Sequence, residues 1–189
     1  MAASQPPRRI PAGATAQGDG IALGGGPVTV DAYIDFLCPY CRQFEMDAGP
    51  ALGDMITEGL ISLVYHPMSF LDEASTTRYS SRAAAASGCA SDGGKFPEYV
   101  SALFGAQPPE GGPGLTDAEL IELGVSAGLA RPEFGPCVLA GRYLDWPSFV
   151  TEQAVARGVS ATPTVLVAGR PAAPDTRAIS AAVAAARAG

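Results

Sequence analysis

Alternating apolar positions mark the first clear element of the chain. From Val28 to Phe36 every second residue is apolar, and β-branched and aromatic residues dominate, as in a strand buried on one face. The turn-forming sequence Gly-Gly-Gly-Pro precedes it at positions 24–27. Three shorter segments are predicted as strands on the same grounds: 21–23 at a sheet edge, 61–65 and 164–167.

Helical patterns cover most of the remaining chain. Pro39 suits the first position of a helix, which is expected to run to about Gly59 with a bend or break at Gly49–Pro50. Thr116 and Glu119 form a capping box, in which each side chain bonds to the backbone N–H of the other residue. The remaining helices are predicted over residues 72–87, 96–104, 116–128, 132–142, 147–157 and 175–188.

The order of these elements predicts an α/β protein in which a helical domain interrupts the sheet domain. The helices between the last two strands are too many for one crossover connection. We therefore assign residues 21–68 and 158–189 to the sheet domain, and residues 69–157 to an inserted helical domain. Residues 1–20 are rich in Ala, Pro and Gly and hold no apolar run, so we expect a flexible leader there.

The composition limits the classes of function. Apolar residues make up 47% of the 189 residues and charged residues 16%, which is typical of a folded globular protein. The net charge of −7 argues against binding to nucleic acids. No apolar run is long enough to cross a membrane, and the leader lacks the apolar core of a signal peptide.

The motif Cys38-Pro39-Tyr40-Cys41 carries the strongest chemical signal. It directly follows the buried strand and begins a helix, so Cys38 faces unpaired backbone N–H groups and the positive end of the helix dipole. Both features stabilise the thiolate, the reactive form of cysteine. Cys41 lies one turn later, close enough to form a disulfide. The motif therefore predicts a redox-active disulfide with no further cofactor and no metal.

Two other cysteines leave alternatives open. The four cysteines allow a structural disulfide between Cys89 and Cys137 in the helical domain, which fits an oxidising compartment. They also allow a zinc site, if Cys89, Cys137 and His66 joined the motif, although a second closely spaced ligand pair is absent. His66, the only histidine, is otherwise expected to be a hydrogen-bonded structural residue.

Three segments of the chain resemble DsbA-like proteins of the thioredoxin fold, in particular the secreted or membrane-anchored type of Gram-positive bacteria. They are Phe-Leu-Cys-Pro-Tyr-Cys-Arg-Gln-Phe-Glu at 36–45, Tyr-His-Pro at 65–67 and Val-Ser-Ala-Thr-Pro-Thr at 159–164. The resemblance extends over about residues 20–188. It implies a thioredoxin fold with an inserted helical domain, and an extracytoplasmic location with a signal or anchor upstream of this sequence.

The resemblance also implies roles for individual residues. Cys38 would be the nucleophile, Cys41 the resolving cysteine, and Pro163 a cis-proline that faces them. Thr162 would offer backbone groups to an extended substrate. Considered without the motif, Pro163 would be an ordinary trans proline at a strand start. The implied partners are unfolded or reduced secreted proteins and a membrane redox partner that resets the disulfide.

Two positions depart from the family pattern. Such proteins carry a buried acid before the motif that is proposed to relay a proton, but the matching position here is Ala32. Asp35 is a candidate proton relay in its place; the alternative is a residue that is solvated or bonded to N–H groups at the helix start. Tyr40 stands where DsbA has a histidine, so Cys38 lacks one cationic neighbour and its pKa is expected to be lowered less.

The sequence thus predicts a thiol-disulfide oxidoreductase that acts as a monomeric oxidase of protein thiols. A disulfide reductase or isomerase on the same fold is the first alternative, since the residues do not fix the direction of electron flow. A non-catalytic zinc-binding or redox-sensor module is the second alternative, and metal content would distinguish it from the others.

Overall fold

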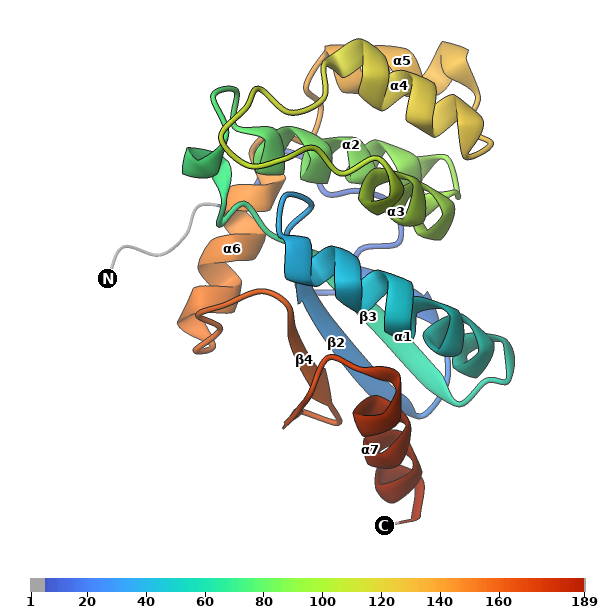
Figure 1. Ribbon diagram of the computed structural model, residues 1–189. Coiled ribbons are helices and arrows are strands. Elements are labelled where there is room, and N and C mark those ends of the chain that lie inside the picture. The colour runs from blue at the N-terminus through green and yellow to red at the C-terminus, as the bar shows by residue number, and fades with distance from the viewer. Residues whose placement is uncertain (1–5, 189) are drawn as a thin grey trace.

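A five-stranded sheet carries the Cys-Pro-Tyr-Cys motif in the computed structural model, which describes residues 6–188. Its strands are β1 (Ile21–Gly24), β2 (Val28–Ile34), β3 (Ile61–Pro67), β4 (Thr164–Val167) and β5 (Arg170–Ala172). The strand order is β1-β3-β2-β4-β5 (Figure 1), with β2 parallel to β3 and antiparallel to β4. The apolar strand β2 therefore lies at the centre, and the motif follows its carboxyl end.

The helices form two groups around this sheet. α1 (Pro39–Thr57) and α7 (Thr176–Ala188) contact each other and lie against the sheet (Figure 1). The other group separates β3 from β4 in the chain. It consists of η1 (Asp72–Ala74), α2 (Tyr79–Asp92), α3 (Phe96–Gly105), α4 (Asp117–Ser126), α5 (Arg131–Leu139) and α6 (Trp146–Ala156). Of these, α2 to α5 pack together beyond the start of α1, and α6 contacts β3.

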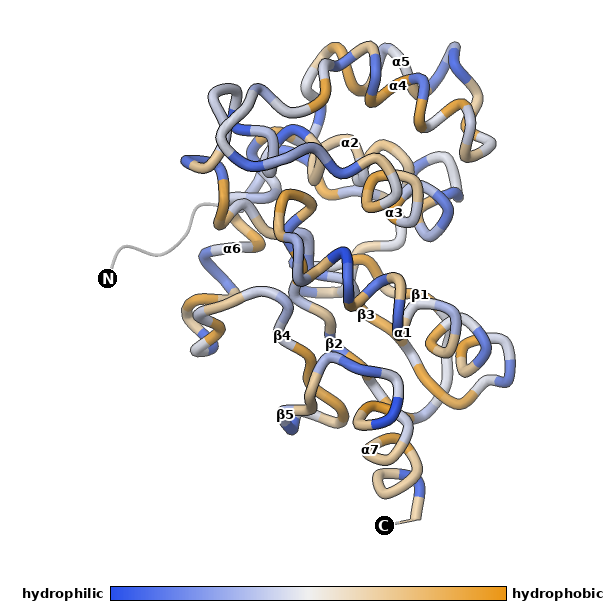
Figure 2. The backbone as a smooth tube through the Cα atoms, viewed as in Figure 1, coloured by the Kyte–Doolittle hydropathy of each residue, from blue (hydrophilic) through white to orange (hydrophobic). Residues whose placement is uncertain are grey.

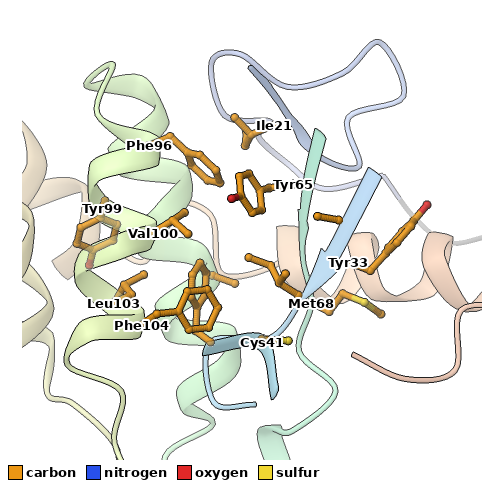
Figure 3. Packing of buried hydrophobic residues seen from close by; sticks show 14 of the residues in the cluster. Ile21, Tyr33, Cys41, Tyr65, Met68, Phe96, Tyr99, Val100, Leu103 and Phe104 are labelled. Atoms are coloured by element: carbon orange, nitrogen blue, oxygen red, sulfur yellow. The ribbon is translucent and has the colours of Figure 1, made fainter. Parts of the chain in front are cut away.

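One apolar core extends from the sheet into the inserted helices. Figure 3 shows Phe96, Val100 and Phe104 of α3 directed toward the sheet, where the Phe96 and Tyr65 rings lie 5.8 Å apart. The apolar colouring in Figure 2 follows β2, β3 and the helices that surround them. Five large aromatic residues of the insert are buried, at 5% exposure or less: Phe96, Tyr99, Phe104, Tyr143 and Trp146.

Most of the predicted elements occur close to their expected bounds. The capping box at Thr116 and Glu119 is confirmed, with Glu119 N–H donating to Thr116 Oγ1 and Thr116 N–H to Glu119 Oε2. The sequence does not predict β5, because this three-residue strand includes Pro171. Of the bend or break expected at Gly49–Pro50, the break is absent. α1 continues through Pro50, which is exposed to solvent.

The single helix predicted over 72–87 is wrong, because the chain leaves the helical conformation between η1 and α2. Arg78 has a left-handed backbone with φ of 54°, and Ser75 is extended. Side chains take the place of helical hydrogen bonds here, since Ser75 Oγ accepts from Tyr79 N–H and the Asp72 carboxylate accepts from Ser81 N–H. These local bonds start α2 afresh at Tyr79.

The expectation of a flexible leader over residues 1–20 is wrong for the described residues 11–20, and residues 1–5 lie outside the described part. Asp19 is 3% exposed and forms an ion pair with Arg157. Trp146 Nε1 donates to the Gly18 carbonyl at 2.7 Å, and Ala12 N–H donates to Asp92 at 2.9 Å. The partners lie 80 to 138 positions away in the chain, so local composition does not reveal them.

None of the helices within residues 6–188 combines the length and the hydropathy that a membrane crossing requires.

The structure contains the expected disulfide between Cys89 in α2 and Cys137 in α5. The two residues are 48 positions apart, so the bond closes a large loop within the insert. In the chain-entropy account, such a bond stabilises the fold by restricting the unfolded chain.

Replacing both Cys89 and Cys137 by Ser should lower the free energy of unfolding by about 4 kcal/mol, the chain-entropy value for a loop of this length. Chemical denaturation measures this, in a Cys38→Ser/Cys41→Ser background so that only this bond differs. A reductant should then lower the denaturation midpoint of the background protein and leave the fourfold variant unchanged. Equal midpoints with and without reductant would contradict the prediction.

Candidate active site

The motif occupies the turn between β2 and α1. Cys38 is the N-cap residue of α1 and Pro39 is the first residue of the helix. The reactive sulfur therefore lies at the N-terminus of α1. The Cys38 carbonyl accepts from the N–H groups of Cys41 and Arg42 at 3.1 and 3.2 Å. Both motif cysteines are free thiols. Cys38 is 5% exposed, and Cys41 is fully buried at 0%.

The start of β4 brings a second segment to the motif. The Thr162–Pro163 peptide bond is cis, and Cys38 Sγ lies 3.4 Å from the Thr162 carbonyl oxygen. These residues are 124 positions apart in the chain. The structure thus brings together the four residues that the sequence proposed as the reactive centre and its substrate-facing edge: Cys38, Cys41, Thr162 and Pro163.

The pKa values of the two thiols are shifted in opposite directions. A hydrogen bond from the Cys41 thiol, opposed by burial and assisted by the N–H groups of Cys41 and Tyr40, lowers the pKa of Cys38 from 9.0 to about 6. Burial, followed by this same hydrogen bond to Cys38, raises the pKa of Cys41 well above that of a free thiol. At neutral pH, Cys38 is therefore a thiolate and Cys41 a thiol that donates to it.

Asp35 lies immediately before the motif and is fully buried. Its carboxylate accepts from the N–H groups of Leu37 and Leu71, both at 2.9 Å, and from Ser80 Oγ at 2.6 Å. Burial raises its pKa to about 6, and the charge on Cys38 adds to this shift. Asp35 contacts Cys41 through its backbone: the Asp35 N–H donates to Cys41 Sγ, with the nitrogen 3.4 Å from the sulfur. The expectation of a solvated Asp35 is therefore wrong, but the other form of that alternative, bonds to N–H groups near the helix start, is confirmed.

An open groove of about 580 Å³ borders the reactive sulfur. Its walls come from the motif, from the segment before Pro163 and from the insert: Cys38, Pro39, Tyr40, Phe70, Leu71, Glu110, Ser160, Ala161 and Thr162. A second hollow of about 430 Å³ has Pro163 in its lining and shares Thr162 and Tyr40, which is 68% exposed, with the groove. An extended polypeptide could lie across Cys38 here with its backbone beside Thr162.

Residues of the insert also contact the motif or the residues just before it, and sequence reasoning does not identify them. Gln107, Leu71 and Ser80 bond to groups between Asp35 and Cys38 from 36 to 71 positions away. They have no motif of their own, so the sequence carries no signal for them.

The side chains considered for a zinc site are engaged elsewhere. Cys89 and Cys137 are bonded to each other. His66 stacks on Tyr33, and its ring nitrogens lie 2.7 Å from the Asp19 carbonyl and 3.0 Å from Asp31 Oδ1. Within residues 6–188, no three His, Cys, Asp or Glu side chains are arranged to hold a metal ion. His66 has the structural role that was expected of it.

The chain is similar to known proteins of the thioredoxin family. Residues 18–184 match the sequence model of the family described as thioredoxin. The chain is 33% identical to DsbA of Mycobacterium tuberculosis, covering 89% of this chain and 100% of that one, with a TM-score of 0.73 for the oxidised structure. It is likewise 33% identical to DsbG of Mycobacterium tuberculosis, covering 91% and 96%, also with a TM-score of 0.73.

Two further matches carry less weight. MdbA of Actinomyces oris, a thiol-disulfide oxidoreductase, is 18% identical and has a TM-score of 0.76 over 93% of this chain and 92% of that one, which shows the shared fold alone. The serine/threonine-protein kinase PknE of Mycobacterium tuberculosis is 33% identical over 132 residues, which is 65% of this chain. This chain matches only 23% of the length of the kinase.

In the reduced protein, one thiol should titrate at about pH 6, detected by the ultraviolet absorbance of the thiolate. Replacing Cys41 by Ala should raise that midpoint, because it removes the hydrogen bond that contributes most to lowering the pKa of Cys38. Cys38→Ala serves as the control and should show no thiolate below about pH 8.5. A wild-type midpoint near 9.0, the ordinary thiol value, would contradict the assignment.

Proposed function

Because the chain belongs to the thioredoxin family as a thiol-disulfide oxidoreductase of the DsbA type, we propose that it is an oxidase that donates the Cys38–Cys41 disulfide to protein substrates outside the cytoplasm. The substrates are unfolded or reduced secreted proteins, and a membrane redox partner resets the disulfide. The enzyme works as a monomer and is secreted or membrane-anchored.

The lowered pKa of Cys38 is the observation that supports an oxidase. A thiolate with a pKa of about 6 is stabilised at pH 7 by roughly 1.4 kcal/mol relative to the protonated thiol. This energy belongs to the reduced form only, because the disulfide carries no charge. It raises the reduction potential of the pair by about 30 mV and so favours transfer of the disulfide to a substrate.

The cysteines divide the reaction between them. A substrate thiolate attacks Cys38 Sγ, the S–S bond breaks, and Cys41 leaves with the electron pair and takes up a proton. A second substrate thiolate then attacks the substrate sulfur of the mixed disulfide, which releases the Cys38 thiolate. The substrate is oxidised to a disulfide and the Cys38–Cys41 pair is reduced. The exposure difference supports this order, since Cys41 is completely buried.

The location outside the cytoplasm is supported by the second disulfide. Disulfides such as Cys89–Cys137 persist in oxidising compartments and are rare where cytosolic reductants act. The groove beside Thr162 supports protein substrates, because it is open and offers a backbone carbonyl next to the reactive sulfur.

We assign proton transfer at Cys41 to Asp35. With a pKa of about 6, its carboxyl group can take or return a proton near neutral pH. Cys41 needs such a group, because its own pKa is raised by burial and it must lose a proton before it attacks a mixed disulfide. The Asp35 backbone already contacts the Cys41 sulfur.

The reduced protein should unfold at higher denaturant than the oxidised protein. Since the folded pKa of Cys38 is depressed from 9.0 to about 6, its contribution is absent below pH 6, grows between pH 6 and 9, and is complete above 9. The difference in unfolding free energy should therefore rise by about 1.4 kcal/mol per pH unit in that window. Equilibration with glutathione checks the potential independently. If the oxidised protein unfolds at higher denaturant than the reduced protein, the oxidase proposal is overturned and the reductase alternative is left.

Changing Cys41 to Ser should leave substrate proteins covalently attached to Cys38, because no second thiol can release them. Cys38→Ser should trap none, since Cys41 is buried. Non-reducing electrophoresis followed by peptide mapping identifies the attachment site. Equal trapping by the two variants would show that the roles are assigned wrongly.

Replacing Asp35 by Asn should slow, by tenfold or more, the step in which Cys41 displaces glutathione from a mixed disulfide on Cys38 at pH 7. The rate should then rise steeply with pH, because hydroxide must remove the Cys41 proton. Asp72→Asn is the matched control: Asp72 is also buried and accepts a serine hydroxyl, from Ser81. If both variants react like the wild type, Asp35 is not the proton acceptor.

A further inference from the structure

Gln107 contacts the motif from the inserted helical domain. It lies two positions after the end of α3, and its side-chain nitrogen Nε2 donates two hydrogen bonds. One goes to the Phe36 carbonyl at 2.9 Å and the other to the Cys38 carbonyl at 3.0 Å. A primary amide nitrogen carries two hydrogens, so both of its donors are used on these two acceptors.

The Phe36 carbonyl lies where regular structure provides no partner, whereas the Cys38 carbonyl also accepts the first backbone hydrogen bonds of α1, from Cys41 and Arg42. The ladder between β2 and β3 ends with Met68 N–H donating to Ile34, so Phe36 lies beyond the sheet. Phe36 is also completely buried, and an unpaired carbonyl there would cost about 1–3 kcal/mol. Gln107 supplies that missing donor.

The bond to Cys38 has a more direct consequence for the reactive sulfur. The Cys38 carbonyl belongs to the peptide plane that leads into α1, so its orientation sets the backbone angle ψ of Cys38, here 118°. That angle determines how the N–H groups of Tyr40 and Cys41 face the Cys38 sulfur. Those N–H groups are among the donors that stabilise the thiolate.

The position of Gln107 itself is well fixed. The residue follows Phe104, whose ring lies 5.1 Å from that of Phe36, and its N–H donates to the Phe104 carbonyl at 3.3 Å. From another part of the insert, Leu71 N–H and Ser80 Oγ bond to the Asp35 carboxylate. The insert therefore holds residues 35–38 by two separate sets of hydrogen bonds.

We propose that Gln107 is a positioning residue that sets the redox properties of Cys38 through the two carbonyls it bonds. The inference rests on the proposed role of Cys38 as the attacking thiolate. Gln107 does not touch the sulfur. It holds the backbone in the conformation in which the helix N–H groups face the thiolate, so the inserted domain contributes to the redox potential of a motif in the sheet domain.

The test compares three replacements of Gln107 with a matched control. Gln107→Ala removes both donors, Gln107→Asn keeps the amide on a shorter side chain, and Gln107→Glu places an acceptor against two carbonyls. Gln153→Ala, in α6, controls for loss of a glutamine elsewhere in the insert. Each protein is assayed for the pKa of Cys38 by thiolate absorbance, for its redox equilibrium with glutathione, and for its unfolding by denaturant.

Gln107→Ala and Gln107→Asn should each raise the pKa of Cys38 by about 1. At pH 7 the redox equilibrium should then move about fivefold toward the disulfide, equivalent to about 20 mV. Gln107→Glu should move both further in the same direction, because its carboxylate also opposes a nearby thiolate. Gln153→Ala should change neither.

Two results would overturn the inference. In the first, the Gln107 variants lose stability while the pKa of Cys38 and the redox equilibrium stay at wild-type values, which is the outcome of a merely structural role. In the second, Gln153→Ala shifts them equally. Failure of the proposed function is distinct from both, because it would appear in the wild-type protein as a Cys38 pKa near 9.0.

Discussion

The contact between Cys38 Sγ and the Thr162 carbonyl, at 3.4 Å, is the constraint on which the rest of the structure depends. It joins the end of β2 to the start of β4, across 124 positions of the chain. The antiparallel pairing of these two strands as neighbours in the sheet places them together. The observed register, with Tyr33 opposite Thr164, puts Thr162 and Pro163 level with the turn that follows β2. The central position of β2 between β3 and β4 is thus the structural condition for the site.

The insert acts on this site as part of the same packed body. The Phe36 and Phe104 rings pack the segment before the motif against α3. Hydrogen bonds from Leu71, Ser80 and Gln107 reach three residues that precede or begin the motif: Asp35, Phe36 and Cys38. A helical cap that only shielded the sulfur would not need such contacts. Their arrangement means that a change in the packing of the insert alters the backbone around Cys38.

Local chemistry made much of this site predictable from the sequence. The strand, the motif and the helix that starts at Pro39 follow from neighbouring residues, and the family resemblance added Thr162 and Pro163. The errors arose where distant partners decide the structure. Residues 11–20 are fixed by hydrogen bonds from Trp146 and Arg157, and no pattern within that segment predicts these contacts. The interruption at Ser75 to Arg78 depends on Asp72 reaching Ser81, a bond that helical periodicity does not encode.

The opposite shifts at Asp35 and Cys38 suit the proposed proton transfer, because each charge affects the other. Burial raises the pKa of Asp35 to about 6, and the negative charge of Cys38 is one of the causes. When Cys38 is held in a mixed disulfide that charge is absent, so the pKa of Asp35 falls and the carboxylate is ionised. It can then accept the proton of Cys41, whose thiol must ionise before it attacks. When a thiolate forms again at Cys38, the affinity of Asp35 for a proton rises. The occupancy of Cys38 thus determines whether its buried neighbour accepts a proton or retains one.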